Sequence, residues 1–262
     1  IDYVKEFNES SIDAKVVKYS DVLLEPQKTY NFRKLSFDHP LFIMYSSGTT
    51  GKPKSIVHSS GGTLIQHVKE LMLHVDLKEK EKIFYFTTCG WMMWNWLASS
   101  LYFGSTIVLY DGSPFFPNNH SLLKIAAQTS INIFGTSAKY IDYLEKNNII
   151  PRDNGSFSSL RTILSTGSPL YESNFDFVYN EWKENVQISS ISGGTDIISC
   201  FALGCPVLPV TKGLLQCLGL AMDVHSYNPK GESILDQKGE LVCTKAFPSM
   251  PISFWNDDSG EI

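Results

Sequence analysis

From residue 83 onward, short apolar runs rich in β-branched and aromatic residues alternate with amphipathic segments of helical period. The runs predict strands at 83–88, 106–110, 131–134, 160–165 and 187–191, and the segments between them predict helices at 92–103, 119–129, 137–147 and 172–184. Strands joined through helices pair in parallel and are covered on both faces. We therefore expect an α/β fold with a doubly wound, mostly parallel sheet and helices on both faces.

Three regions follow from the composition along the chain. Residues 1–38 are polar and irregular, residues 39–199 carry the α/β pattern, and after residue 200 proline, glycine and short strand-like runs such as "GELVCT" replace the helical period. We expect an irregular lead-in from a missing upstream part, an α/β core, and a small β-rich subdomain over 200–262 that is truncated. Because the chain starts at Ile1 and stops in a turn-like stretch, we expect a piece of a longer protein.

Local signals refine some of the helices. An apolar stripe at helical spacing is formed by Leu64, Ile65, Val68, Leu71, Met72 and Val75. It predicts an amphipathic helix that begins just past Gly61 and Gly62 and turns this stripe towards the core. Three later helices have candidate N-caps in Asn119, Thr136 and Ser173, whose side chains would satisfy unpaired N–H groups of the first turn.

Charge and cysteine content narrow the class of partner. The formal net charge is -5, from 22 basic and 27 acidic residues without long blocks of one sign, so no basic face for nucleic acid is expected. This balance favours a protein that handles small molecules. The 5 cysteines form no C-x2-C pair and lie mostly in apolar runs, which favours reduced thiols in the cytosol over a zinc site.

One stretch, residues 83–110, has no charged residue and is long enough for a membrane helix. It also contains hydroxyl, amide and glycine residues, and it divides well into strand, helix and strand. We favour a buried βαβ segment, with a membrane-associated protein as the alternative.

The segment "YSSGTTGKPK" at residues 45–54 follows the apolar run "LFIMY", which we expect to be a buried strand. It is not a Walker A loop, because only two residues separate its glycines and Pro53 follows Lys52. Its hydroxyls, backbone N–H groups and lysine charge suit phosphate oxygens. The candidate phosphate ligands are Ser46, Ser47, Gly48, Thr49, Thr50, Gly51, Lys52 and Lys54. A polar turn between two elements is the alternative.

Two further glycine-bearing turns, "STGSPL" at 165–170 and "SGGTDI" at 192–197, follow consecutive predicted strands. Ligands of open α/β sheets bind outside the carboxyl ends of the strands, where both turns would lie. Glycine lets the backbone approach a flat ring, and Thr195 and Asp196 offer oxygen ligands for Mg²⁺ and phosphate. The candidate residues are Gly167, Ser168, Pro169, Gly193, Gly194, Thr195 and Asp196. Each turn alone would more often be an ordinary turn.

These three motifs, in this order, resemble the adenylate-forming superfamily of acyl-CoA synthetases, luciferases and peptide-synthetase adenylation domains. The segments "HPLFIMYSSGTTGKPKSIVHSSGG", "CGWMMWNW", "LYDGSP", "FGTSAKYI", "SISGGTDIISCF" and "FPSMPISFWND" resemble the branch that activates acetoacetate, over about residues 38–258. The resemblance implies an acid-thiol ligase of lipid and ketone-body metabolism that uses ATP, Mg²⁺ and coenzyme A.

Roles for single residues follow from the same resemblance. It implies that Thr195, Asp196 and Lys54 take part in catalysis, with Thr195 and Asp196 at the metal, although relatives often carry Glu in place of Asp196. It also implies an acyl pocket beside Trp91, Met92, Met93, Trp94 and Gly193. Acetyl-CoA synthetases carry a bulky Trp just before their Thr-Glu pair, so glycine at 193 and 194 should leave room for a longer acid.

Other readings stay open. The lone His58 is more often structural than a substrate contact, and neither His67 nor His74 is assigned a role. No "TGD"-like segment follows "FWNDDSGEI", and the C-terminal domain with the catalytic lysine is expected to be absent. The alternatives are therefore a ligase for another short-chain acid, or a truncated, non-catalytic module that binds a nucleotide or an acyl group.

Overall fold

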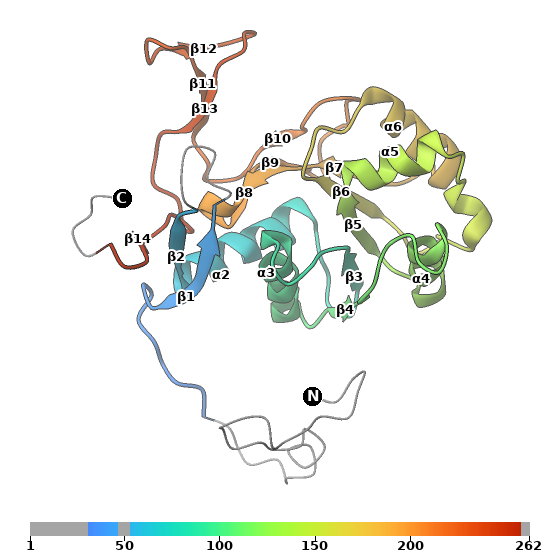
Figure 1. Cartoon of the computed structure of the whole chain (residues 1–262), viewed down its shortest axis with the longest axis horizontal. Coiled ribbons are helices and arrows are strands. Elements are labelled where there is room, and N and C mark those ends of the chain that lie inside the picture. Colours follow the sequence, from blue (N-terminus) through green and yellow to red (C-terminus); the bar gives the residue numbers. More distant parts are fainter. Residues whose placement is uncertain (1–30, 47–52, 258–262) are drawn as a thin grey trace. The chain divides into compact units, whose positions relative to one another are not determined.

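The computed structural model describes residues 31–46 and 53–257. The chain divides into a short unit that ends at Leu35 and a main unit that begins at Ser36. All helices and strands of the described residues belong to the main unit (Figure 1).

A five-stranded parallel sheet forms the centre of the main unit. Its strands, in chain order, are β3 (Lys82–Tyr85), β4 (Thr106–Val108), β5 (Ile133–Ser137), β6 (Thr162–Thr166) and β7 (Gln187–Ser190). Their order in the sheet is β4-β3-β5-β6-β7, so the chain first moves to one edge and then returns to build the other side. This is a doubly wound topology, and it confirms the expected fold class.

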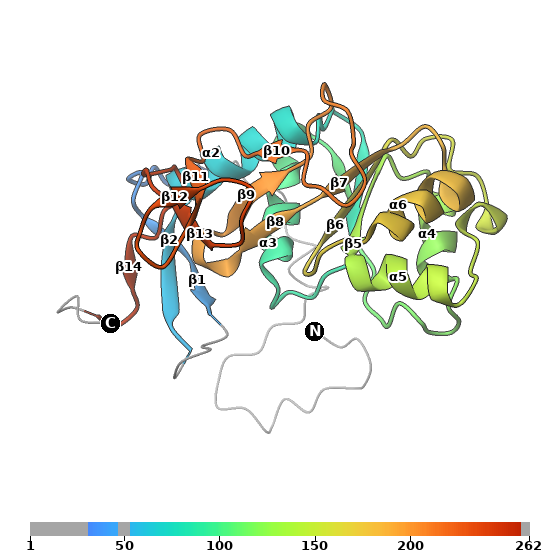
Figure 2. The same ribbon diagram turned by 90° about the horizontal axis from the view of Figure 1, so that it is seen from above.

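Helices cover both faces of this sheet, as the alternation of strand side chains requires. Phe84 points into a core shared with the helices on one face, whereas Ile83 and Tyr85 point into the core on the other face. The helices of the first face are α4 (Ser121–Thr129), α5 (Ala138–Lys146) and α6 (Glu172–Phe177). The second face carries α3 (Met92–Ser99), beside α2 (Ser60–Lys69), and Figure 2 shows the two groups on opposite sides of the strands.

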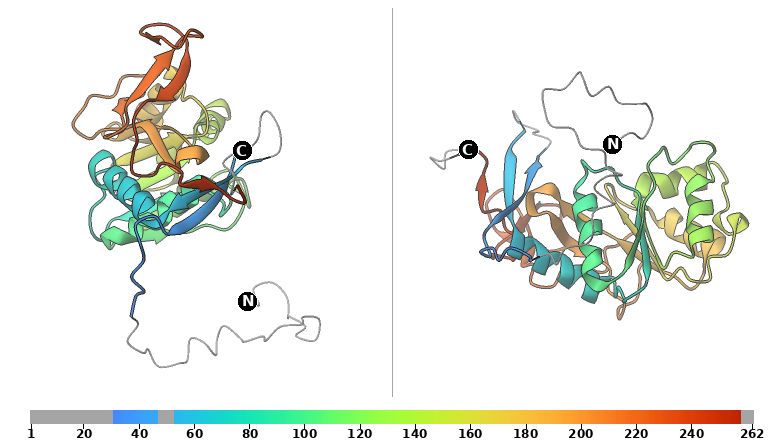
Figure 3. Two further views of the ribbon diagram at one scale, coloured as in Figure 1. Left: turned by 90° about the vertical axis from the view of Figure 1, so that its left-hand side faces the viewer. Right: turned by 90° about the horizontal axis from the view of Figure 1, so that it is seen from below.

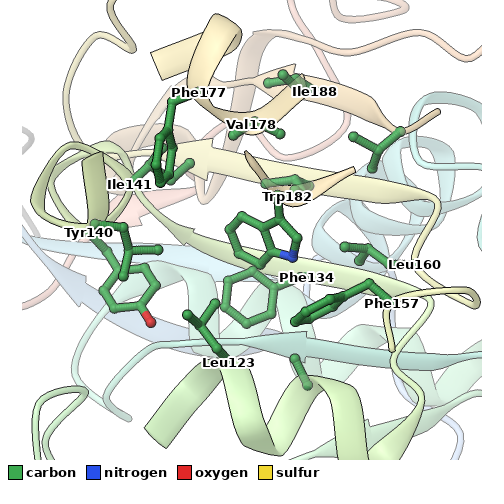
Figure 4. Close-up of a cluster of buried hydrophobic side chains, with 14 of the residues drawn as sticks. Leu123, Phe134, Tyr140, Ile141, Phe157, Leu160, Phe177, Val178, Trp182 and Ile188 are labelled. Atoms are coloured by element: carbon green, nitrogen blue, oxygen red, sulfur yellow. The ribbon is translucent and has the colours of Figure 1, made fainter. Parts of the chain in front are cut away.

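The core of the first face is rich in aromatic rings (Figure 4). Trp182 meets Phe134 edge to face with ring centroids 5.1 Å apart, and its contact with Phe157 is 5.7 Å. Phe134 comes from β5 and Trp182 from η5 (Val178–Trp182), a π-helical turn that extends α6. The rings therefore fix the α6 region against the sheet, and truncating such a buried ring typically costs about 3–5 kcal/mol.

Three small antiparallel sheets complete the main unit. The first joins β1 (Pro40–Tyr45), β2 (Ser55–Ser59) and β14 (Ser253–Phe254), and Figure 3 shows β14 beside the β1–β2 hairpin. The second joins β8 (Ser192–Gly194), β9 (Ser199–Leu203) and β10 (Cys217–Leu218), and the third joins β11 (Val224–Tyr227), β12 (Ser233–Ile234) and β13 (Glu240–Cys243). Strands from before and after residue 200 thus share two of these sheets, and the subdomain division stays a prediction.

Helix α2 and the turn after it bury only part of the predicted apolar stripe. Leu64, Ile65 and Met72 are exposed, whereas the polar residues Gln66, His67, Glu70 and His74 are buried. The prediction of an apolar stripe facing the core was therefore wrong for these three apolar residues, whereas Leu71 and Val75 of the same stripe are buried as predicted. The helix packs against β9 and α3, where backbone carbonyls and polar side chains need hydrogen-bond partners, so its polar face turns inward.

The start of α2 also differs from its prediction. The helix begins at Ser60 and includes Gly61 and Gly62, with the Ser59 side chain accepting a hydrogen bond from the Gly62 N–H at 3.2 Å. A Cβ on Gly62 would lie 2.0 Å from the Pro248 carbonyl oxygen, so a close approach of backbone requires glycine there.

Other local predictions were off by smaller amounts. The N-caps of α4, α5 and α6 are His120, Ser137 and Tyr171. Strand β1 is mostly exposed rather than buried, with Tyr45 66% exposed. Helix α3 ends at Ser99 and continues as the 3-10 turn η3 (Ser100–Phe103), while α2 continues as the π-helical turn η2 (Glu70–His74). A further 3-10 turn, η4 (Pro151–Asn154), precedes β6.

Within the described residues, no helix is long and apolar enough to cross a membrane.

Candidate active site

Two adjoining cavities open beyond the carboxyl ends of β6 and β7. The larger has a volume of about 470 Å³ and the smaller about 170 Å³. Both are lined by Thr166, Gly167, Ile191 and Gly193, so they share a wall. This is the edge of the sheet where ligands of doubly wound folds bind.

The larger cavity brings together both predicted glycine turns. Gly167, Ser168 and Pro169 line it on the β6 side, and Gly193 lines it on the β8 side. Gly167 has φ +88, a conformation that glycine adopts without strain. The segment Gly213–Leu215 forms a further part of the lining. The sequence prediction missed this segment, although Gly213 (φ +74) marks a turn there.

The smaller cavity lies between Trp91, Gly167 and the turn that begins at Thr195. A Cβ on Gly167 would lie 3.7 Å from Trp91 Cζ2, which is ordinary van der Waals contact. Trp91 also meets Tyr85 edge to face, with centroids 5.8 Å apart. Met92 and Met93 line this cavity, whereas Trp94 is not among its lining residues, and their role in an acyl pocket stays a prediction.

Thr195 and Asp196 occupy the tip of the β8–β9 hairpin. They begin the 3-10 turn η6 (Thr195–Ile197), which is followed by Ile198 in a left-handed conformation. Thr195 is half-buried and lines the smaller cavity, while Asp196 is exposed. The Asp196 Oδ2 lies 3.5 Å from the position of a Cβ on Gly194, which also lines this cavity.

The two glycines before Thr195 differ in their surroundings. A Cβ on Gly193 would lie 2.2 Å from the Ser199 carbonyl oxygen, so strand pairing with β9 excludes any side chain there. A Cβ on Gly194 would meet nothing nearer than Asp196, and its φ of -160 is extended backbone that any residue adopts. Glycine is therefore required by the hairpin at position 193, whereas position 194 has room for a side chain beside the smaller cavity.

The predicted phosphate loop connects the two strands of the β1–β2 hairpin. Tyr45 pairs with Ser55, the Ser46 N–H donates to the Lys54 carbonyl at 3.0 Å, and the Lys54 N–H donates to Ser46 Oγ at 3.2 Å. The Lys54 ammonium lies over the Phe254 ring of β14, 5.3 Å from its centroid. The predicted ligands Ser47, Gly48, Thr49, Thr50, Gly51 and Lys52 lie outside the described residues.

His58 joins this hairpin to the turn at Thr195. It lies on β2, is fully buried, and its Nε2 is 3.2 Å from the Thr195 carbonyl oxygen. Burial lowers the pKa of His58, against the opposing influence of nearby backbone groups and of the Asp196 charge. Because a neutral ring can donate only from a protonated nitrogen, this contact assigns the proton to Nε2.

The chemistry of the site suits a metal that arrives with a substrate. Among the described residues, no group of three or more histidine, cysteine, aspartate or glutamate side chains is placed to hold a metal ion. Yet the Asp196 carboxylate is exposed, so a ligand can reach it. Magnesium commonly binds one or two protein oxygens together with substrate phosphates, and Thr195 with Asp196 fits that donor set.

Comparison with known proteins gives the family. Residues 4–247 match the family described as "AMP-binding enzyme". The chain belongs to this family. Its AMP-binding relatives include the acetoacetyl-coenzyme A synthetase of Rhizobium meliloti (strain 1021), which is 56% identical over 229 residues, covering 87% of this chain and 35% of the relative. The acetoacetyl-CoA synthetase of Gallus gallus is 50% identical over 229 residues, covering 87% of this chain and 34% of the relative.

A solved AMP-binding structure agrees with the fold. The acetoacetyl-CoA synthetase from Streptomyces lividans superposes with a TM-score of 0.87 at 45% sequence identity, covering 92% of this chain and 38% of that chain. The chain thus spans about a third of the length of the curated relatives it matches.

Proposed function

We propose that this chain carries the nucleotide- and acid-binding face of a ligase that joins acetoacetate to coenzyme A at the expense of ATP. The observation that carries the proposal is the pair of cavities with a shared wall, one large enough for part of a nucleotide and one small enough for a short acid. The names of the AMP-binding relatives, at 56% and 50% identity, support acetoacetate as the acid.

The reaction has two steps. A carboxylate oxygen of acetoacetate attacks the α-phosphorus of ATP, and the bond from that phosphorus to the bridging oxygen breaks, which releases pyrophosphate and leaves an acyl-adenylate. The thiol of coenzyme A then attacks the acyl carbon, loses its proton, and displaces AMP. Both reactants of the first step are anions, so the main tasks of the protein are to hold them in contact and to offset their charge.

The described residues divide these tasks. Gly167 and its neighbours present a bare backbone surface on which the flat adenine ring would lie. Thr195 and Asp196, at the tip of the β8–β9 hairpin, would hold Mg²⁺ together with the phosphates. That ion would offset the charge of the phosphates and of the leaving pyrophosphate. Ser46 and Lys54, at the base of the phosphate loop, face the same phosphates in this proposal.

The smaller cavity suits the acid. Its volume of about 170 Å³ is bounded by Trp91, by Met92 and by the open position at Gly194. Helix α3 begins at Met92 without a side-chain cap and without an acidic residue in its first turn. Its N-terminal N–H groups therefore form a positive end beside the cavity, which favours a carboxylate there.

The cellular setting is part of the proposal. All 5 cysteines are free thiols in the structure, which supports a reducing compartment such as the cytosol. The proposed partners are small molecules: ATP, coenzyme A and the acid.

Pyrophosphate release tests the proposal. The full-length gene product is supplied with ATP, Mg²⁺ and acetoacetate, acetate, butyrate or 3-hydroxybutyrate, and a Thr195→Ala variant is compared with Thr129→Ala, a half-buried threonine on α4. We expect the wild type to release pyrophosphate with acetoacetate. The rate should fall by about 10²–10³-fold in Thr195→Ala, as when one group that stabilises charge in the transition state is removed, and it should persist in Thr129→Ala. ATP binding without release for any acid would favour a non-catalytic binding module instead.

A further inference from the structure

Three buried side chains form hydrogen bonds with backbone carbonyl groups of the Thr195–Ile198 turn. The carbonyl oxygen of Ile198 is 2.6 Å from His67 Nε2, and that of Thr195 is 3.2 Å from His58 Nε2. The carbonyl oxygen of Ile197 accepts a hydrogen bond from Ser249 Oγ at 2.6 Å. None of the three donor residues is more than 1% exposed. Because each comes from a different segment, the turn is fixed from three directions.

The turn needs such support because its last residue is strained. Ile198 has φ +48 and ψ 34, a conformation in which a β-branched side chain meets its own backbone. A residue in such a region costs about 1–3 kcal/mol and persists only where its surroundings impose it. His67 donates its hydrogen bond to the carbonyl of this same residue. This contact and the Ser249 contact are the two shortest of the three, both 2.6 Å, and the His67 contact lies at the residue whose backbone would otherwise relax.

The chemistry of His67 is consistent with a fixed donor. Burial lowers its pKa, with the nearby Glu70 carboxylate opposing the shift, so the ring is neutral near pH 7. A neutral ring that donates from Nε2 must accept at Nδ1, and the Ser99 hydroxyl lies 2.9 Å from that atom. Both ring nitrogens are therefore satisfied, and the ring has one orientation.

The same helix also fixes the start of β9. The Ser199 hydroxyl donates to Glu70 Oε1 at 2.5 Å, and Gln66 Nε2 donates to the Ser199 oxygen at 2.7 Å. The polar face of α2 and η2 that the sequence did not predict to be buried is thus the surface on which the turn and the beginning of β9 rest.

We propose that His67, together with His58 and Ser249, is a positioning residue that holds Thr195 and Asp196 in the conformation required for binding MgATP. This role rests on the proposed ligase function. None of the three residues lines either cavity, so they act on substrate only through the backbone of the turn. Small displacements of a binding group are sufficient to lower the rate, because about 1 Å can cost on the order of 10²-fold.

His74 offers a matched control, since it is a second buried histidine seven residues along the same helical segment. Its Nδ1 is 2.8 Å from the Gly204 carbonyl oxygen, and its Nε2 accepts the Leu220 N–H at 3.1 Å. It therefore holds the far end of β9 and the segment after β10 rather than the turn. A general loss of stability should be similar for His67→Leu and His74→Leu, whereas an effect on the turn should appear in the first alone.

The first experiment measures kinetics of the full-length gene product with His67→Leu, His67→Gln and His74→Leu, well below their melting temperatures. We expect kcat/KM for MgATP to fall by about 10–100-fold in His67→Leu, with KM for coenzyme A unchanged. Glutamine retains an N–H near the position of Nε2, so His67→Gln should recover most of the activity. Equal losses in His67→Leu and His74→Leu would overturn the proposal.

The second experiment does not depend on activity. Hydrogen exchange without ligand should be at least about tenfold faster over residues 195–199 in His67→Leu, because local opening of a fixed turn becomes easier. In His74→Leu the faster exchange should fall at 204 and 220 instead. Unchanged exchange at 195–199 would refute the positioning role even for an active enzyme. If His67→Leu does not fold, Ser249→Ala removes only one hydroxyl and serves in both experiments.

The two experiments separate the two proposals. A wild-type protein that releases no pyrophosphate with any acid refutes the ligase function and, with it, the positioning of MgATP. A wild-type protein that turns over acetoacetate but shows no difference between His67→Leu and His74→Leu refutes the positioning role alone.

Discussion

Adding one methyl group should lower the stability of the fold at Gly193 and raise it slightly at Gly194, although the residues are neighbours. At Gly193 the new Cβ would lie 2.2 Å from the Ser199 carbonyl oxygen and 2.9 Å from the Cys200 Cα. Both are backbone atoms of the paired strand, so no side-chain rotation can relieve the contact. At Gly194 the nearest atom is a carboxylate oxygen 3.5 Å away, which is ordinary van der Waals contact.

The free energies of unfolding follow from these distances. Gly193→Ala forces the β8–β9 backbones apart, and overpacking of this kind costs about 1–3 kcal/mol. Gly194→Ala places alanine at φ -160, which it adopts freely, and a compatible Gly→Ala change stabilises by about 0.4–1 kcal/mol through the unfolded chain. The two variants should therefore differ by about 1.4–4 kcal/mol, with Gly193→Ala the less stable.

Selectivity for the acid should change only at Gly194. Its methyl group would narrow a cavity of about 170 Å³, and one methylene in such a pocket is worth about 10–200-fold in discrimination. The ratio of kcat/KM for acetoacetate to that for acetate should fall by at least about tenfold in Gly194→Ala.

Urea denaturation and pyrophosphate release on the same full-length preparations test both expectations. Equal stability of the two variants would show that the hairpin tolerates a Cβ at Gly193. An unchanged selectivity ratio in Gly194→Ala would show that this position does not border the acid.

Three further predictions concern stability. Burial lowers the pKa of three histidines below the usual 6.5, namely His58, His67 and His74. Below about pH 6.5 the unfolded chain therefore binds protons that the folded chain excludes. As the pH is lowered from 6.5, the free energy of unfolding should decrease by about 1.4 kcal/mol per pH unit for each histidine until its folded pKa is reached. Urea titrations at pH 7.5 and 5.5 measure the slope, which should be smaller in His74→Gln. In Glu70→Leu, the buried hydroxyl, amide and indole donors lose their acceptor, and about 3–5 kcal/mol should be lost in the same assay, whereas a loss below 1 kcal/mol would contradict the network. Arg161→Met removes two hydrogen bonds of 2.6 Å to the Glu81 carboxylate and two to backbone carbonyls, and it should lower the melting temperature through a loss of about 1–3 kcal/mol, with Arg161→Lys recovering only part.

The α/β core was predictable because its signal is local. Each strand from β3 to β7 and each helix between them appears within a few residues of its prediction, since apolar period and turn chemistry are properties of short segments. The carboxyl-end rule then placed Gly167 and Thr195 at one edge of the sheet, where the structure has both.

What the sequence could not provide depends on contacts across long separations. The partners of His67 and Glu70 in the β8–β9 hairpin lie about 130 residues further along the chain, so the apolar stripe at Leu64 and Ile65 was the strongest signal available locally. It favoured the wrong face of α2. The segment Gly213–Leu215 was missed for a similar reason, because nothing within the turn itself indicates that it lines a cavity.

Several residues of the β8–β9 hairpin, which carries the "SGGTDI" motif, depart from the conformational and burial preferences of their residue types. Among non-glycine residues with positive φ in the described ranges, Ile198 is the one with a β-branched side chain, whereas most of the others are Asp, Asn or Ser in turns. The polar face of α2 is buried against this residue, and Gly193 permits a backbone approach that no other residue allows. Strain, buried polar groups and a close backbone contact each cost free energy and persist together where function requires a fixed geometry. Strain, buried hydrogen bonds and a close backbone contact are independent of any resemblance to known ligases. Together they indicate that the conformation of the Thr195–Ile198 turn is tightly restricted.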